Sequence, residues 1–278
     1  MISIVICGIN PDYKLQIEQN ITQTIGSNYE IFYHDNTLQP KSIATVYNFY
    51  LKIANGEYIC FCHEDVKFTT QNWGIKLKEI FNTNEQIGLI GLAGAFYKSK
   101  TPSSWAGIGL KYLSCNYTQQ YKTGEREKVY HQNIDKFATE VVCIDGFFMC
   151  LHGNLKSKIT FNESILNSFH GYDLDLSLQV LKNNRKIIVT NQFSMIHFSE
   201  GTMNLDWYKT HKKLIHFWKN HLPIQISSIK NNEVLQIEYA AFHNGLNYLI
   251  KSKSYFEIII HFISYFKFNF IIHYFIKK

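Results

Sequence analysis

The chain has 278 residues, of which 46% are hydrophobic and 18% are charged, and this balance excludes an intrinsically disordered protein. The N-terminus shows no basic segment followed by a small-residue cleavage site, so we expect no secretory signal and a body that stays in the cytoplasm. The six cysteines lie mostly inside apolar runs, which indicates reduced core cysteines and not a disulfide framework.

Charge is distributed unevenly along the chain. Residues 1–208 carry 18 Lys and Arg against 19 Asp and Glu, whereas residues 209–278 carry 10 against 3. The net charge of +6 therefore comes from the last quarter, which is also rich in Phe, Tyr and Ile. A basic, aromatic surface suits anionic lipid or nucleic acid. No nucleic-acid motif accompanies the charge, so we expect no nucleic-acid partner.

Residues 1–95 predict strands that alternate with helices. Apolar runs indicate strands at residues 2–6, 30–33, 58–62 and 88–95, and amphipathic spacing indicates helices at residues 14–26, 42–54 and 73–82. This alternation is typical of a doubly wound α/β fold with a mixed, mainly parallel central sheet. Gly88, Gly91 and Gly94 do not have the spacing of a dinucleotide-binding loop.

A polar cluster formed by His63, Glu64 and Asp65 directly follows the third predicted strand. In open α/β sheets, ligands bind at the carboxyl ends of the strands, so this cluster is a candidate metal or ligand site. An ordinary polar turn is the alternative. A zinc site that uses Cys60 and Cys62 is disfavoured, because no second pair at metal-ligand spacing is present.

The second half of the chain changes character. Residues 98–136 are polar and rich in tyrosine, which predicts loops that shape a pocket. The apolar segment at residues 141–151 predicts a strand that carries Asp145, and a buried carboxylate on a strand is costly unless something binds it. Three further elements are expected: a helix at residues 169–181 that contains Asp173 and Asp175, a strand at residues 186–190, and a loop at residues 194–202 that carries His197 and Ser199.

The order of these segments resembles the family 2 glycosyltransferases, and most closely a bacterial branch in which the Asp-any-Asp signature begins with a histidine. The resemblance covers about residues 1–202 and rests on an N-terminal strand, a strand-end Asp35, and the segments IATVYN, HEDV, IGLIGLAG, DGFFM, GYDLDLSL and HFSEG. It implies a GT-A fold, a nucleotide-diphosphate sugar donor, a divalent metal, and inversion at the anomeric carbon.

The resemblance also implies a metal site on Asp65 and His197. Asp65 matches the final, metal-holding acid of the signature, and His197 matches a histidine that reaches the metal or the pyrophosphate; a structural histidine is the alternative. A departing nucleoside diphosphate needs a cation to stabilise its charge. Oxygen ligands suit Mg²⁺ or Mn²⁺, and a histidine ligand favours Mn²⁺.

Donor binding is expected from residues near the carboxyl ends of the first strands. Asp35 matches the family acid that contacts the nucleoside, although an Asx-type turn with Asn36 is the alternative. His63 occupies the position of the first signature acid. The full expected donor set is Cys7, Asn10, Asp35, Asn48, His63 and Glu64.

Inverting transfer also needs a base for the acceptor hydroxyl. Asp173 matches the Asp of the family's Glu-Asp motif, with Tyr172 in place of the Glu, and is the expected base. Asp175 is its catalytic competitor, although it could instead orient the acceptor or cap the helix. The expected acceptor residues are Trp105, Asp145 and Gly146.

Residues 255–276 predict a mostly apolar helix. Its polar stripe consists of Glu257, His261, Ser264 and Lys267, and the register of this stripe is lost at Asn269. A helix that lies in the membrane interface fits this pattern better than one that spans the bilayer. A helix that packs on the body or on another subunit is the alternative.

We therefore expect a GT-A domain at residues 1–222 and a helical, membrane- or partner-associating extension at residues 223–278. The expected function is metal-dependent sugar transfer to a surface glycan (a lipooligosaccharide, a capsule or a lipid-linked acceptor) on the inner face of the cytoplasmic membrane. A catalytically inactive sugar-binding, nucleotide-binding or assembly module on the same fold is the alternative, and a homo-oligomer is possible.

Overall fold

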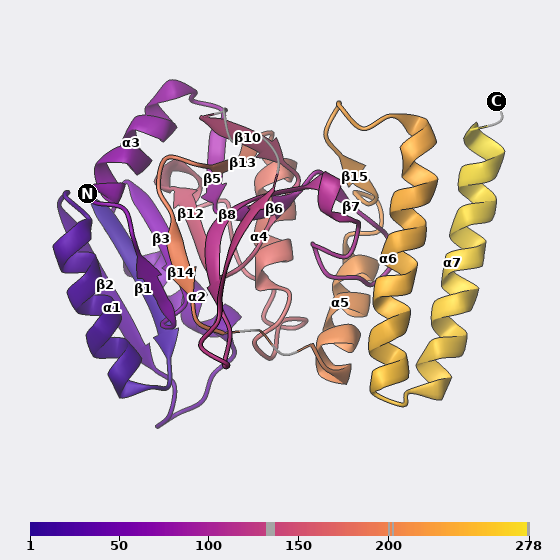
Figure 1. The fold of residues 1–278 in the computed structure, drawn as a ribbon, viewed down its shortest axis with the longest axis horizontal. Coiled ribbons are helices and arrows are strands. Elements are labelled where there is room, and N and C mark those ends of the chain that lie inside the picture. Colours follow the sequence, from indigo (N-terminus) through magenta and orange to yellow (C-terminus); the bar gives the residue numbers. More distant parts are fainter. Residues whose placement is uncertain (132–136, 200, 202, 277–278) are drawn as a thin grey trace.

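The central sheet of the computed structural model contains seven strands within the described residues, which are 1–131, 137–199, 201 and 203–276 (Figure 1). In spatial order these strands are β10 (Ala138–Val141), β13 (Lys186–Thr190), β5 (Ile87–Gly91), β12 (Phe148–His152), β3 (Tyr58–Cys62), β1 (Ile2–Gly8) and β2 (Tyr29–Asp35). β1 pairs in parallel with β2 and β3, whereas β12 lies antiparallel between β3 and β5. The predicted mixed α/β sheet is confirmed.

The parallel register brings three strand ends together. Gly8 at the end of β1 is paired with Asp35 at the end of β2, and Ile6 is paired with Cys62 at the end of β3. The polar segment that begins at His63 therefore leaves the sheet beside the ends of β1 and β2. This is the ligand-binding edge that the sequence predicts.

A further sheet lies beside the central one (Figure 1). It contains β11 (Cys143–Ile144), β6 (Ala93–Ala95), β8 (Leu113–Gln120), β14 (Met195–His197) and β4 (Val66–Phe68), with β9 (Arg126–His131) paired to β8. β15 (Ile224–Gln225) pairs separately with β7 (Tyr97–Lys98).

Two sequence predictions are corrected by this sheet. The single strand expected at residues 88–95 is two strands, because the chain leaves the central sheet after Gly91 and enters the second sheet as β6. The loops expected at residues 98–136 contain the hairpin of β8 and β9, whose polar side chains hide the strand pattern. Residues 132–136 lie outside the described part of the chain.

Helices cover the sheets and extend the molecule on one side. They are α1 (Pro11–Thr24), α2 (Ile43–Ile53), α3 (Trp73–Thr83), α4 (Tyr172–Lys182), α5 (Leu205–Phe217), α6 (Asn231–Lys251) and α7 (Tyr255–Ile276), with short 3-10 helices at Leu110–Tyr112 and Gly153–Leu155. Figure 1 shows α5, α6 and α7 as a layer at the right of the molecule, with α7 outermost. None of the described helices is long and apolar enough to cross a membrane.

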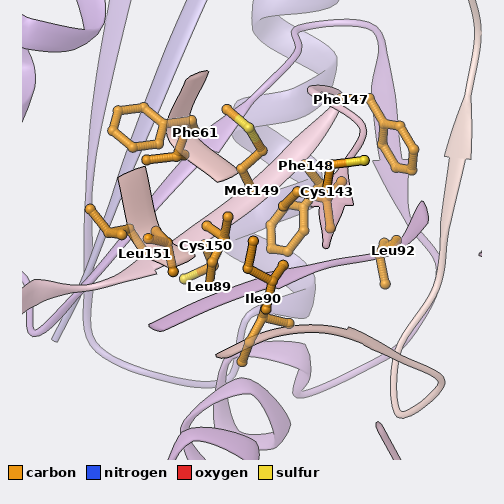
Figure 2. Close-up of a cluster of buried hydrophobic side chains, with 14 of the residues drawn as sticks. Phe61, Leu89, Ile90, Leu92, Cys143, Phe147, Phe148, Met149, Cys150 and Leu151 are labelled. Carbon is orange, nitrogen blue, oxygen red and sulfur yellow. The ribbon is translucent and has the colours of Figure 1, made fainter. Parts of the chain in front are cut away.

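The core is centred on β12, which is packed between its two neighbours (Figure 2). The side chains of Phe148, Met149, Cys150 and Leu151 are fully buried. Each large apolar side chain buried in this way stabilises the fold by roughly 1.5–3 kcal/mol. The loops that leave β3 and enter β12 therefore start from a rigid base, and they carry the candidate site.

Candidate active site

Two histidines and one aspartate gather at the edge where β3 ends. Nδ1 of His63 lies 3.7 Å from Oδ1 of Asp65, and Nε2 of His197 lies 3.8 Å from the same oxygen. One ligand atom from each residue lies within 4.8 Å of the other two. β14 pairs with β4, so that His197 lies opposite Val66 and reaches the cluster from 132 positions further along the chain than Asp65.

The surrounding side chains orient both histidines. Nε2 of His63 lies 2.6 Å from the hydroxyl of Tyr172, and Nε2 of His197 lies 3.2 Å from the hydroxyl of Ser199. Gly146 lets the Tyr172 ring approach, because a Cβ atom at this position would collide with it. Burial lowers the pKa of His197, and the charge of His63 adds to this effect. His197 is therefore held in the neutral form that binds metals.

The donor set of this cluster fits a divalent cation. Two imidazole nitrogens and a carboxylate suit Mn²⁺ better than Mg²⁺, which prefers oxygen ligands alone. Were His63 to hold this cation, the Tyr172 hydroxyl beside its Nε2 would be the outer partner that fixes the orientation of the ring, a role more often taken by a carboxylate, a backbone carbonyl or water. The sequence assigned His63 to the donor nucleotide, whereas the geometry groups it with Asp65 and His197.

A cavity of about 450 Å³ opens beside this cluster. His63, His197 and Asp173 line it, so the metal-ligand candidates and the expected base face the same space. Asp173 lies in the first turn of α4, after Gly171, whose positive φ of 80° favours glycine. Burial raises the pKa of Asp173 to about 7, and the negative charge of Asp145 contributes. A carboxylate with this pKa is matched to proton transfer near neutral pH.

The expected acceptor residues lie in the same cavity. Asp145 is in the loop between β11 and β12, and not on a strand as the apolar pattern predicted. Its Oδ2 accepts a hydrogen bond of 2.6 Å from Nε1 of Trp105, and its Oδ1 accepts one of 3.0 Å from the Phe147 amide. Trp105, Asp145 and Gly146 all line the cavity wall.

Glu64 does not line this cavity. Its carboxylate accepts hydrogen bonds from the amides of Ile9 and Asn10 and from the hydroxyl of Tyr33. Asn10 is also the N-cap of α1, where its side chain accepts from the amides of Asp12 and Tyr13. Glu64 and Asn10 therefore tie the loop after β1 to the loop after β3.

Cys7 and Asp35 lie near these hydrogen bonds of Glu64, at the ends of β1 and β2. The Asp35 carboxylate accepts from the amide and the hydroxyl of Thr37, which is the turn geometry that the sequence analysis left as the alternative. These bonds lower the pKa of Asp35. Burial raises the pKa of Cys7 to about 11, so its thiol stays protonated at neutral pH.

Two further predicted residues lie away from the cluster, at a separate cavity of about 660 Å³. Asn48 on α2 is buried, and it exchanges hydrogen bonds with the backbone of Phe161. Asp175 is fully buried and accepts from Nε1 of Trp218, the amide of Asn162 and Nε2 of Gln179. The structure therefore brings Asp173 to the candidate site and gives Asp175 packing partners.

Several residues of the cavity were not found from the sequence. They include Lys98, Ser103, His170, Trp207 and His211. Lys98 lies in a region expected to be loop, and Trp207 and His211 belong to α5, after the last recognised motif. A Trp and a His four positions apart share one face of a helix, and this spacing was the available signal.

Comparison with known proteins identifies the family of the chain. The model of the "Glycosyltransferase like family" matches residues 3–218. No curated protein sequence matches the chain.

The solved structures that are similar to the chain include GalNAc-T7 and TarS. A crystal structure of GalNAc-T7 with UDP, GalNAc and Mn²⁺ is 8% identical, with a TM-score of 0.54 over 80% of this chain and 49% of that chain. The present chain thus spans about half the length of that protein. TarS 1–349 from S. aureus is 13% identical, with a TM-score of 0.48 over 88% of this chain and 80% of that chain. The family match and the fold shared with GalNAc-T7 confirm the predicted resemblance and the predicted GT-A fold.

Proposed function

Because the chain belongs to the glycosyltransferase-like family, we propose that it moves a sugar from a nucleoside-diphosphate donor to a hydroxyl of a surface-glycan acceptor, with inversion at the anomeric carbon. The observation that carries the proposal is the one cavity shared by His63, His197 and Asp173. GalNAc-T7, which has the same fold, was crystallised with UDP, a sugar and Mn²⁺, and this supports a nucleotide-sugar donor and a divalent metal.

Each side chain has a distinct role in the proposed reaction. Asp65, His63 and His197 hold a cation, which when bound supplies positive charge to the diphosphate as it leaves. Tyr172 fixes the ring of His63. Asp173 accepts the proton of the attacking hydroxyl, and Asp145, held by Trp105, orients the acceptor sugar. Asp175 holds α4 to α5 through Trp218, so we assign the base role to Asp173.

Thermal unfolding in the presence of UDP-, GDP- and CMP-sugars, with and without Mn²⁺, tests this function. A ligand present at 100 times its Kd stabilises the folded state by about 2.7 kcal/mol, which raises the Tm measurably. We expect one nucleotide class to raise the Tm, and to do so only with the metal. The anomeric configuration of the product, read from its proton NMR couplings, then tests inversion.

A sugar- or nucleotide-binding module without turnover is the second candidate. This candidate is favoured by Tyr172, which stands where the family has a Glu. The phenol of Tyr172 is bound to His63 and cannot act as an acid or base near neutral pH. Burial raises the pKa of Tyr172 well above its usual value. Such a module would bind the donor with Mn²⁺ but would neither hydrolyse nor transfer the sugar.

We also propose that residues 223–278 hold the enzyme on an anionic membrane surface. Two polar residues of α7 turn toward the body: Glu257 pairs with Lys212 of α5 at 2.7 Å, and His261 is buried between Tyr208 and the Phe242 carbonyl. Several apolar residues turn outward. Exposed fractions reach 73% for Phe256, 59% for Ile259 and 63% for Phe266, although such faces are normally buried. The side chains of Lys267 and Asn269 lie outside the described part of the structure.

The occupant that fits this face is a bilayer with anionic headgroups. Residues 209–278 carry 10 basic and 3 acidic residues, and Lys251 and Lys253 are exposed at the turn that joins α6 to α7. Lysines near an anionic surface contribute about 1 kcal/mol each, and aromatic and aliphatic side chains bury themselves in the acyl boundary. This placement suits an acceptor that is itself linked to lipid on the inner face of the cytoplasmic membrane. A second copy of the chain on the same face is the competing outcome.

A further inference from the structure

Lys98 lies at the wall of the cavity that contains Asp173. Its side chain is only 1% exposed, and its ammonium donates hydrogen bonds to the carbonyl oxygen of Ser103 at 2.7 Å and to the Ser103 hydroxyl at 3.1 Å. Among the described residues, no carboxylate lies within ion-pair distance of Lys98. A buried cation with neutral partners is costly unless a nearby anion compensates it.

Two carboxylates act on Lys98 from a greater distance, Glu238 on α6 and Asp173 on α4. The oxygens of Glu238 are already occupied by the hydroxyls of Tyr97 and Ser99, each at 2.6 Å. The Asp173 carboxylate accepts a hydrogen bond from the Leu174 amide of its own helix, and Asp173 lines the cavity. Both carboxylates can stabilise the ammonium of Lys98, but of the two only Asp173 shares the cavity wall with it.

We propose that Lys98 is a positioning residue for the base: its ammonium keeps the carboxylate of Asp173 ionised inside the cavity, so that Asp173 can take the acceptor proton. The inference rests on the proposed function, because it takes Asp173 as the base. Burial and the charge of Asp145 favour the protonated carboxyl, and Lys98 opposes them. Without Lys98, Asp173 would stay protonated to a higher pH.

The other titratable groups around Asp173 do not supply this charge. Burial raises the pKa values of Tyr47, Tyr172 and the Cys143 thiol, so these groups are uncharged near neutral pH. Burial lowers the pKa values of His170 and His211, which also line the cavity, so these imidazoles are neutral there as well. Asp145 adds a negative charge, and Lys98 is the one lysine among the described residues that line this cavity.

The C-terminal extension holds Lys98 in place. Ile224 of β15 pairs with Lys98 of β7, and the fully buried Glu238 of α6 binds Tyr97 and Ser99, the residues on both sides of Lys98. The segment that follows Lys98 is also attached to α6, because Asn244 accepts from the amide of Ser104. The extension thus shapes the acceptor side of the active site in addition to presenting α7 to the surface.

The test is a titration of Asp173 that does not depend on turnover. In protein labelled with ¹³C at the aspartate carboxyls, Asp173→Asn identifies the Asp173 resonance. We expect the midpoint of this resonance to rise by about 0.5–1 pH unit in Lys98→Met, because the stabilising charge is gone. Lys98→Arg should stay near wild type, and so should Lys158→Met, which removes an exposed lysine from the cavity on the other side of α4.

The wild-type protein provides a second readout that needs no variant at Lys98. Burial lowers the pKa of Lys98 to about 8, so the Asp173 resonance should show a second inflection near that pH. A wild-type curve without this inflection overturns the proposal, and so does an unchanged midpoint in a folded Lys98→Met protein. If the shifts appear but no donor is turned over, the proposed function fails and the electrostatic pairing stands.

Discussion

The hydroxyl of Tyr172 lies 2.6 Å from Nε2 of His63, and this contact joins the first turn of α4 to the metal-ligand candidates. A single contact thus links the helix that carries the proposed base to the loop after β3.

Tyr172→Phe should weaken Mn²⁺ binding. The ring of His63 would lose the partner that fixes its tautomer, and loss of such an outer partner typically costs about 10- to 100-fold in metal affinity. Calorimetric titration of Mn²⁺ into the variant measures the change. An affinity equal to that of the wild type would place the cation away from His63.

Asp65→Asn should abolish metal-dependent binding of the nucleotide. Asp65 is the shared partner of both histidines, so the variant loses the anionic ligand that offsets the charge of the cation. Titration of UDP, or of the nucleotide found in the screen, with Mn²⁺ is the measurement. Glu64→Gln is the matched control, because Glu64 binds backbone amides instead of the triad. Loss of binding in the control alone would refute the assignment.

Asp173→Asn should retain donor binding and reduce kcat by about 10²- to 10⁴-fold, the usual contribution of a positioned base. Because the pKa of Asp173 is about 7, wild-type kcat should rise with pH around a midpoint of about 7. Steady-state rates between pH 5 and 9 test both statements. If Asp173→Asn lowers kcat only slightly and Asp175→Asn lowers it strongly, Asp175 is the base instead of Asp173.

The same substitution should stabilise the fold at alkaline pH. The pKa of Asp173 in the folded chain, about 7, lies above the ordinary value of 3.8, so the unfolded chain releases this proton first as the pH rises. The free energy of unfolding therefore falls as the pH rises from about 4 to about 7, by the contribution of this one carboxyl. Asp173→Asn removes this loss, and its Tm should exceed that of the wild type at pH 8 and match it at pH 4. Equal Tm values at pH 8 would contradict the burial of this charge.

Asp175→Ala should destabilise the protein without a specific effect on donor affinity. The substitution leaves the buried Nε1 of Trp218 without its acceptor, which costs about 1–3 kcal/mol, and it also removes the contacts with Asn162 and Gln179. Urea unfolding measures the loss. If the variant unfolds like the wild type but loses activity, Asp175 takes part in catalysis.

Phe256→Glu combined with Ile259→Glu should prevent sedimentation with vesicles that contain anionic lipid. These changes place two charges on the outward face of α7, where burial in the acyl boundary would stabilise apolar side chains. Leu38→Glu is the control, because Leu38 is 85% exposed but lies in the loop before α2. Wild-type binding that ignores salt and lipid charge would argue against the electrostatic part, and a concentration-dependent dimer that the variant abolishes would identify a second copy as the occupant.

Much of the fold and part of the site could be predicted from local sequence. The apolar run at residues 58–62 predicts β3 at its observed bounds, Tyr58–Cys62. A short apolar run between polar breakers is typical of a fully buried strand. The same run places His63 and Asp65 at a strand end. Asp173 is indicated by its match to the family's Glu-Asp motif, and the local pattern adds only that it lies near the start of a helix. Such features depend on neighbours within one turn or one strand.

The tertiary structure decided which distant residues meet. It brought His197 to Asp65, Trp105 to Asp145, and Lys98 to the cavity of Asp173 through contacts with α6. It also turned Glu257 and His261 of α7 inward, although their spacing shows only that they share a face. The physical reason is that periodicity determines which side chains lie together on an element, whereas the direction that this face takes depends on the partner that packs against it.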